Sequence, residues 1–540
     1  MTKRRHKKRE GQQPSDRLTN LVGQAILLWR RTNWPALILT ITVLLVCRES
    51  MAQTGAGASS MPKAQQAPLP QSGGSVEAQQ STVGSAGSSS SVNTLNSTIQ
   101  VSGSYQGSVP DPKAPQGPLT LTIADAIHRG LQFNLGGVTA SLGVRQARAL
   151  RLAAVSEMLP NIYATLAETS AKIDLQTEGF SSAVFGGKIT LPTTIGPFHY
   201  YSALGNVSEN LSLTALHNVR QSEASLDAAR MSMADARELI VLAVGGAYLR
   251  VIANQANVVS QEAQVKQAEA SFKLADDQYR AGTKTIIDSN KSLVELRTQQ
   301  QRLGALRGDL SKQTMQLARL IGLPAGQPLI LNEDLPVQVA AAVPLEEGIK
   351  TALDARPDLK SARLQLKAAE EARRASKAEY LPSVGINGNY GVEGINPNKG
   401  VSAYEVSAGV NIHIFDSGRV RSDVDQSDAI VSQLQARYDD LKAAVDLDVR
   451  QVYVDLQVAS EQLKVAQENR QLAAETLTQS VDRFASGVTN SVEVVQSQET
   501  VAAAERDYIS TLFSLNLARI ALAKATGQAE QFIPSMLKGN

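Results

Sequence analysis

The chain of 540 residues has a single cysteine, only 4% aromatic residues and a formal net charge of +2. One cysteine excludes a disulfide scaffold and a cysteine-based zinc site. Charged residues make up 19% of the chain, too few for a polyelectrolyte or a largely disordered protein. The uncharged apolar run from Pro35 to Val46 has twelve residues, short of the ~20 that a permanent membrane-spanning helix needs.

Catalytic motifs are also missing. The sequence contains no Gly-x-Ser-x-Gly, no His-Glu-x-x-His and no Gly-Lys-Ser/Thr phosphate loop. Four of the five histidines are scattered without the spacing of metal ligands; they are His128, His199, His217 and His413. We therefore expect no enzyme, no cofactor and no metal site.

The near-zero net charge is the sum of two segments of opposite charge. Residues 1–52 hold ten Lys or Arg and three Asp or Glu, a net charge of +7, which leaves −5 for the other 488 residues. A basic cluster from Lys3 to Arg9 precedes the apolar run, and Ser50-Met51-Ala52 follows it as a small-x-small site. This order is typical of a secretory signal peptide, which we predict over 1–52. No aromatic residues interleave with the basic cluster, so it does not indicate nucleic-acid binding.

Two alternatives for this segment stay open. An uncleaved inner-membrane anchor would use the same apolar run, although its length argues against it. A lipoprotein would carry its lipid on Cys47, which follows the run directly. Val46 before it is bulkier than the small residue that such a site usually has.

Residues 53–118 are rich in Ser, Gly, Gln, Ala and Pro. Such a composition buries too little apolar area to offset chain entropy, so it predicts a flexible low-complexity segment. Only Ser97 to Tyr105 alternates enough to suggest a short strand.

The rest of the chain consists of two copies of one sequence pattern, an internal repeat. Pro160 aligns with Pro382 at an offset of 222, and Tyr248 aligns with Tyr453 at an offset of 205. The first copy therefore holds 17 extra residues. We predict repeat 1 over 119–322, a linker over 323–343, repeat 2 over 344–527 and a C-terminal tail over 528–540. Each repeat is predicted as helix, strand, strand, very long helix and helix.

Alternation of apolar and polar residues locates the strands. From Tyr404 to Ile414 every second residue is apolar and the residues between are polar or small. Strands of ~9 to 11 residues with two unlike faces are typical of transmembrane β-barrels, although a half-buried strand of a soluble sheet has the same period. We predict strands at about 161–169 and 206–215 in repeat 1, and at about 382–390 and 404–415 in repeat 2.

A seven-residue apolar period marks the long helices. One seam is Val244, Val251, Val258, Val265, Phe272 and Tyr279, and its equivalent is Val449, Leu456, Leu463, Arg470, Leu477 and Phe484. The returning helices repeat the period from Leu296 to Leu317 and from Val501 to Leu522. A strict heptad predicts helices that coil around each other left-handedly. A helix of ~68 residues would be ~100 Å long.

Four strands cannot form a membrane sheet alone, because open edges would leave backbone groups unpaired in lipid. The smallest ordinary barrels have eight strands. If the strands lie in a membrane, the chain must therefore pool them with copies of itself.

The chain resembles the TolC-type outer-membrane efflux protein family. The resemblance rests on a duplicated set of motifs over roughly 119–527: Leu121-Thr-Ile-Ala-Asp-Ala-Ile127, Gly130-Leu-Gln-Phe-Asn134, Leu159-Pro160, Leu381-Pro382, Ile414-Phe-Asp-Ser-Gly-Arg419, Tyr279-Arg-Ala-Gly-Thr283 and Arg483-Phe-Ala-Ser-Gly487. The first copy lacks the Phe-Asp-x-Gly step between Asn210 and Leu216, which leaves that strand boundary open.

The resemblance implies a mostly α fold with a small transmembrane β part. It implies a homotrimer with a twelve-strand β-barrel in outer-membrane lipid, continued by a periplasmic α-helical barrel. It also implies an exit duct of a tripartite efflux or type I secretion system, with a periplasmic adaptor protein and an inner-membrane pump as partners. The alternative is a periplasmic coiled-coil adaptor, which has long helical hairpins but normally lacks paired amphipathic strands.

Carried onto this sequence, the resemblance assigns two sites. The adaptor-docking tips are the helix-to-helix turns, with Tyr279, Arg280, Gly282, Thr283, Arg483, Phe484, Gly487 and Val488. The periplasmic aperture holds an acid six residues after each tip glycine, Asp288 and Glu493, together with Gln496. Structural caps and solvated helix faces are the alternatives. Arg280 and Arg483 are candidates to pair with the two acids and hold the aperture closed.

Overall fold

A computed structural model describes residues 76–78, 99–101, 103–115, 117–175, 192–331, 344–489 and 491–531. Every described element belongs to one unit, Pro70–Asn540. The predicted signal peptide, most of the low-complexity segment and linker, part of the first strand-to-strand loop and the end of the tail lie outside the described residues.

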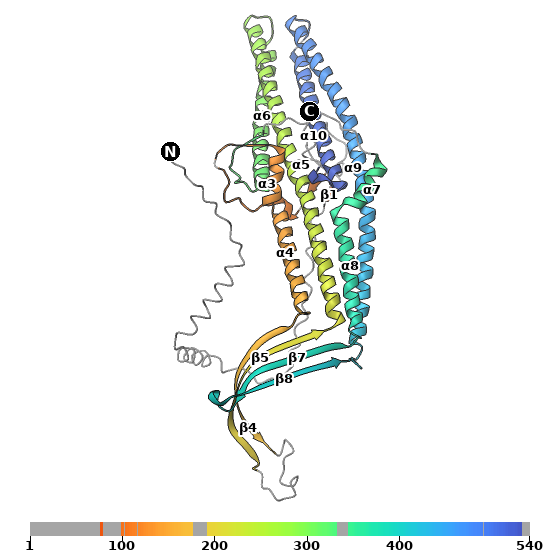
Figure 1. Cartoon of the computed structure of the whole chain (residues 1–540). Helices are drawn as coiled ribbons and strands as arrows, with labels where there is room; N and C mark the ends of the chain where they lie inside the picture. The colour runs from red at the N-terminus through yellow and green to blue at the C-terminus, as the bar shows by residue number, and fades with distance from the viewer. Residues whose placement is uncertain are drawn as a thin grey trace, which may run out of the picture. The chain divides into compact units, whose positions relative to one another are not determined.

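This unit is mostly helical, as predicted (Figure 1). Its longer elements are α3 (Ile123–Phe133), α4 (Leu135–Ser156), β4 (Asn161–Asp174), β5 (Thr194–Leu211), α5 (Leu213–Arg280), α6 (Ile286–Leu320), α7 (Leu345–Ala355), α8 (Pro357–Ala378), β7 (Ser383–Gly394), β8 (Val401–Asn411), α9 (Arg419–Ala485) and α10 (Ser491–Ala525). Its short elements are β1 (Val76–Ala78), β2 (Ile99–Val101), η1 (Gly103–Gln106), β3 (Leu119–Leu121), β6 (Leu329–Leu331) and η2 (Pro397–Lys399).

Two helices, rather than the predicted one, precede each strand pair. Asn134 ends α3 in an extended conformation and caps α4, with its side chain accepting a hydrogen bond from the Gly136 N–H at 2.9 Å. In the second copy Arg356 occupies the corresponding break, because a residue before proline disfavours the helical conformation and Pro357 suits a helix start.

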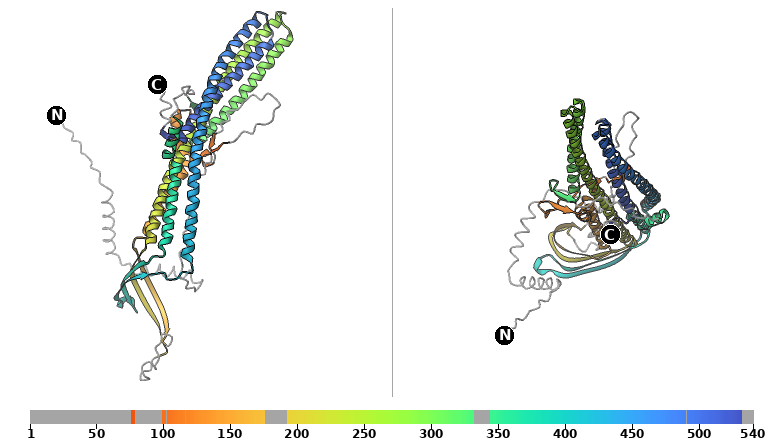
Figure 2. Two further views of the ribbon diagram at one scale, coloured as in Figure 1. Left: turned by 90° about the vertical axis from the view of Figure 1, so that its right-hand side faces the viewer. Right: turned by 90° about the horizontal axis from the view of Figure 1, so that it is seen from above.

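The long strands form one antiparallel sheet in the order β4-β5-β7-β8. Within the described residues, β4 and β8 are its edges, and the sheet is curved but not closed (Figure 2). The strands lie at the opposite end of the long helices from the helix-to-helix turns (Figure 1).

The register gives the sheet two chemically different faces, because residues directly opposite in an antiparallel pair share a face. One face is mainly apolar, with Glu168 and Glu209 as exceptions; it carries Ile162, Leu166, Ala203, Val207, Leu211, Val384, Ile386, Tyr390, Tyr404, Val406 and Val410. The other face is mainly polar; it carries Asn161, Thr165, Asn206, Ser208, Asn210, Asn387, Asn389, Glu405, Ser407 and Asn411. Leu166 and Tyr404 are 84% and 79% exposed, so this chain alone does not cover the apolar face.

The strand boundaries differ from the predicted ones. The strand predicted at 206–215 is β5, which begins at Thr194 and ends at Leu211. Ser212 caps α5 by accepting a hydrogen bond from the Ala215 N–H at 3.1 Å, so residues from Leu213 onward are helical. The strand predicted at 404–415 is β8, which ends at Asn411. Asp416 follows it and accepts hydrogen bonds from the Gly418 and Val420 N–H groups, at 3.1 and 2.9 Å.

The long helices α5 and α9 have 68 and 67 residues. The predicted seam of α5 is buried at Val244, Val251 and Val258. Val244 and Val251 belong to the main hydrophobic core, to which α3, α6 and α10 also contribute. Closer to the turn the buried series shifts to Gln261, Ala268 and Ala275. One stretch of α5 has a mean hydropathy of 1.5, high enough for a membrane span, but 61% of it is buried in this core.

Arg470 interrupts the apolar seam of α9 and has a defined partner on α10. Its Nε lies 2.8 Å from Glu505 Oε1, and its guanidinium lies 4.7 Å from the centre of the Tyr508 ring. The break in the heptad is therefore a polar link between the two helices.

The prediction of a flexible segment up to residue 118 is wrong for residues 103–115. Tyr105 is only 3% exposed, and its carbonyl accepts a hydrogen bond from Asn134 Nδ2 at 2.8 Å. A Cβ on Gly136 would lie 2.3 Å from the Tyr105 ring, so this glycine makes room for it. Asp111 pairs with Arg129 at 2.9 Å. The average composition of 53–118 hides these few anchoring residues.

Candidate functional site: the hairpin tips

The turn after each long helix is closed by a glycine. The first tip (Ala281–Thr285) has Gly282 at φ 73°, and the second tip (Ser486–Thr489) has Gly487 at φ 76°. The Gly282 N–H donates to the Tyr279 carbonyl at 2.9 Å, and the Gly487 N–H donates to the Phe484 carbonyl at 3.0 Å. No atom lies within 4 Å of a Cβ built on either glycine. Positive φ alone therefore favours glycine here.

The predicted aperture acid Asp288 is the third residue of α6. It forms a capping box with Thr285, whose hydroxyl donates to Asp288 Oδ2 at 2.8 Å. Arg280 pairs with Asp276 at 2.8 Å, one turn back on its own helix. The pairing of Arg280 with Asp288 stays a prediction.

The second tip has the predicted pairing. Arg483 Nη1 lies 3.7 Å from Glu493 Oε1, and the Thr489 hydroxyl also donates to the Glu493 carboxylate. Both charged side chains are partly exposed, at 58% and 36%, so water screens the attraction. Gln496 is exposed one turn further along α10.

Lys284 joins the two tips, a contact that the sequence analysis missed. Its Nζ donates to the Thr489 carbonyl at 3.4 Å and lies 5.0 Å from the centre of the Phe484 ring. Phe484 is 4% exposed. At the offset of 205 that relates the two copies here, Lys284 aligns with Thr489. The sequence signal for this contact was that the two copies differ at this position, with lysine in the first and threonine in the second.

Two other tip residues present apolar surface to solvent. Val488 is 69% exposed and Tyr279 is 41% exposed. The tips thus combine rigid glycine turns, exposed apolar side chains and flanking charges, which is the composition of a small protein-contact surface.

Polar side chains fill the helix interfaces near the tips. Gln261 Nε2 of α5 donates to the Gln299 carbonyl of α6 at 3.2 Å. Ser480 and Ser497 hydroxyls lie 2.8 Å apart between α9 and α10. Gln498 Nε2 donates to Ser271 Oγ at 2.8 Å, which links α10 to α5.

A second polar cluster lies buried where α5, α8 and α9 approach one another. Arg356 is 4% exposed and pairs with Asp358 at 2.6 Å and with Asp448 at 3.1 Å. Burial, followed by repulsion from Asp358, raises the pKa of Asp235 to about 6. Burial acts to raise the pKa of Asp358, but the hydrogen bond and the attraction from the Arg356 guanidinium outweigh it. The pKa of this carboxyl therefore lies below its usual value.

Metal chemistry has no support in the described parts of the chain, where no group of three or more His, Cys, Asp or Glu side chains could hold an ion.

An amphipathic, open antiparallel sheet continued by two long helical hairpins defines a class of membrane channel proteins. Crystal structures of this class are similar to the chain. The Vibrio cholerae outer membrane protein VceC aligns with a TM-score of 0.65 at 18% identity, covering 75% of this chain and 96% of VceC. The Campylobacter jejuni outer membrane channel CmeC gives 0.64 at 14%, with 81% and 95% covered. The open Neisseria gonorrhoeae channel MtrE gives 0.60 at 17%, with 79% and 91% covered.

Sequence comparison identifies the family. The outer membrane efflux protein family matches residues 138–323 and 348–528, more than half of the chain. The chain therefore belongs to the outer membrane efflux protein family, whose members are channels rather than enzymes. No match was found among curated proteins.

Proposed function

We propose that the chain is the passive exit duct of a tripartite efflux or type I secretion system. Three chains pool their strands into a twelve-strand barrel in the outer membrane, and their long helices form a tunnel in the periplasm. The observation that carries this proposal is the four-stranded sheet with one mainly apolar face, whose edge strands β4 and β8 have no further partner strand within the described residues. Lipid tolerates such edges only when they are paired.

The domain organisation predicted from the sequence fits this function. A signal peptide over 1–52 exports the chain, and the two repeats over 119–322 and 344–527 each contribute two strands and a helical hairpin. The linker over 323–343 and the tail over 528–540 complete the chain. Energy for transport comes from an inner-membrane pump.

The hairpin tips dock to a periplasmic adaptor. Exposed Val488 and Tyr279 supply apolar contact beside the glycine turns, and Arg280, Thr283 and Arg483 supply polar contact. Asp288, Glu493 and Gln496 ring the aperture in the trimer. The ion pair between Arg483 and Glu493 supports a role in holding it closed.

Disulfide trapping tests the barrel. Cysteines at Thr165 in β4 and Ser407 in β8 should crosslink chains into trimers in outer-membrane fractions, with neighbouring positions scanned to find the register. The control pair is Ser208→Cys with Asn387→Cys, which are opposite each other within one sheet and should crosslink inside a single chain. Recovery as a soluble periplasmic monomer would refute the duct and favour the adaptor.

Conductance tests the aperture. Reversing the charges of both Glu493 and Arg483 preserves a pair, whereas Glu493→Lys alone places two cations together. The single variant should raise single-channel conductance in planar bilayers and the double variant should restore it. If neither differs from the parent, this ion pair does not control the aperture.

A further inference from the structure

In the half of the molecule near the tips, the helices form a row. α6 packs on α5, α5 on α10, and α10 on α9 (Figure 1). Among the described elements, α6 and α9 therefore each have one long side without a neighbouring helix, and we call these sides the α6 edge and the α9 edge. The α9 edge continues the open edge of the sheet, because the edge strand β8 leads into α9, which begins at Arg419.

The α9 edge carries a row of acids. The buried side of this helix holds a series of small residues at every seventh position: Ala459, Ala466, Ala473 and Ser480. An exposed acid lies two residues after each of them: Glu461, Glu468, Glu475 and Asp482. Two residues of a helix correspond to a rotation of about 200°, so the acids lie opposite the buried side. Val465 and Leu472 run beside them and are also exposed.

The α6 edge carries bases. The buried side of α6 near the tip includes Ser289, Ser292 and Glu295. The residues two positions further on are all exposed: Lys291, Val294 and Arg297. Lys312 and Met315 are exposed further along this edge.

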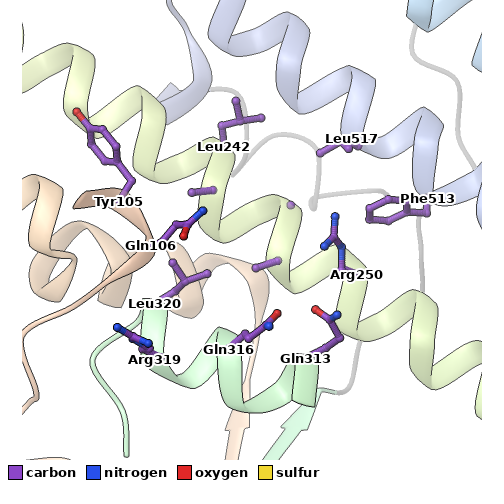
Figure 3. Close-up of a pocket in the computed structure, with 13 residues that line it drawn as sticks. Tyr105, Gln106, Leu242, Arg250, Gln313, Gln316, Arg319, Leu320, Phe513 and Leu517 are labelled. Carbon is purple, nitrogen blue, oxygen red and sulfur yellow. The ribbon is translucent and has the colours of Figure 1, made fainter. Parts of the chain in front are cut away.

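The inner side of α6 is a different surface. It borders a cavity of about 430 Å³ between η1, α5, α6 and α10, and Figure 3 shows Gln313 and Leu320 of α6 there, with Arg250 of α5. Neither Lys312 nor Met315 lines this cavity. The α6 edge is therefore available to a partner outside the row.

The charges of the two edges match in height along the helices. Lys284 Nζ of the first tip donates to the Thr489 carbonyl of the second at 3.4 Å, so the two tips lie at one height. The bases Lys291, Arg297 and Lys312 stand 5, 11 and 26 residues after the first residue of α6. The acids Asp482, Glu475 and Glu461 stand 3, 10 and 24 residues before the last residue of α9. Each base therefore lies within about 3 Å in height of one acid.

We propose that the α9 edge of one chain packs against the α6 edge of a second copy. This contact rests on the trimeric duct proposed above, because rotation about the tunnel axis brings the edges together and leaves every height unchanged. The facing pairs are Asp482 with Lys291, Glu475 with Arg297, and Glu461 with Lys312. Val294 and Leu472 supply apolar contact along the same line. Lys312 also contacts Asp309 of its own helix at 3.2 Å, an exposed pair that is weak enough to exchange.

Disulfide trapping tests the contact in the full-length protein in outer-membrane fractions, with Cys47→Ser as background. Glu468→Cys with Gln301→Cys probes the two edges at nearly one height without changing a facing pair. We expect covalently linked trimers. The matched control is Glu468→Cys with Arg307→Cys, because Arg307 faces Glu262 of α5 at 2.6 Å. The control should give no link between chains.

The sheet pair Thr165→Cys with Ser407→Cys separates this contact from the duct itself. Trimers trapped through the sheet, but not through Glu468 and Gln301, would overturn the α9–α6 contact and leave the duct in place. No trimer from either pair would overturn both. A link from Glu468→Cys to a protein of another mass, in place of the trimer, would assign the α9 edge to an adaptor and also overturn the contact between copies.

Charge reversal tests the pairing. Glu475→Lys should lower the yield of the Glu468–Gln301 link about threefold at low salt, a typical effect of losing one exposed ion pair. Arg297→Glu in the same chain should restore the yield. Gln467→Lys adds a cation on a neighbouring face of α9 and should leave the yield unchanged. A yield that does not change with Glu475→Lys, or that Arg297→Glu fails to restore, would refute the facing pairs.

Discussion

Replacement of Asp235 by asparagine should stabilise the protein at neutral pH. Asp235 is 7% exposed, and its pKa is raised from 3.8 to about 6. The folded state therefore binds the proton more tightly than the unfolded state does. The resulting penalty is fully present above pH 6 and disappears as the pH falls below 3.8. A difference of this size corresponds to about 3 kcal/mol at pH 7, which asparagine should recover because it keeps the shape without the charge.

The charged groups around Asp235 also affect its pKa and the measured stability. Asp358 repels it, whereas Lys524 and Arg356 attract it. Burial also raises the pKa of Glu238, so the stability of the variant still depends on pH. Only the difference between parent and variant isolates Asp235.

The assay is urea unfolding of the detergent-solubilised protein between pH 4 and pH 8, followed by circular dichroism. The variant should be more stable than the parent by about 3 kcal/mol at pH 7, and the gap should close towards pH 4. The control is Asp309→Asn, an acid whose side chain is 60% exposed, which should change stability by less than about 0.5 kcal/mol. An unchanged stability at pH 7, or a gap that is constant with pH, would refute the assignment.

Three further substitutions test the tips and the sheet. Lys284→Gln removes a contact worth about 0.5–1 kcal/mol, so backbone hydrogen exchange at Phe484 and its neighbours should speed up about threefold, whereas Lys312→Gln should have no effect there. Gly487→Ala should cost about 1 kcal/mol of local stability at positive φ, seen as faster exchange confined to the second tip; equal exchange would contradict the turn geometry. Val406→Arg should reduce the free energy of folding into lipid vesicles by about 2–4 kcal/mol, and a similar loss from Ser407→Arg would contradict the assignment of the two faces.

The sequence was most informative where a feature repeats along the chain. Period-two alternation indicated the strand pairs, and heptads indicated the long helices. In both cases one face of the element is apolar, so apolar residues recur at a regular spacing in the sequence. Helix and strand boundaries that depend on one capping residue were harder to predict, as Ser212 at the start of α5 shows. The shift of the buried series from Val258 to Gln261 was hidden, because a polar residue does not mark a helix interface in the sequence.

Contacts between distant segments were the least predictable. Lys284 meets Phe484 across 200 positions, and Tyr105 packs under Gly136 from a segment whose average composition predicts flexibility. Nothing local in the sequence distinguishes these residues from solvated neighbours. The cavity beside Arg250 depends on the spacing of three helices and η1, which also lies beyond a periodicity argument.

The short parallel pairing of β3 with β6 has a consequence for the order of folding. Leu119 pairs with Leu329, so this contact cannot form until the intervening chain has left the export machinery. Helical hairpins such as α5 with α6 rely on much closer contacts and can form earlier. We therefore expect the first copy to collapse around its helices and to close last at β3 and β6. Destabilising that pair should slow the final folding step and leave helix formation unchanged.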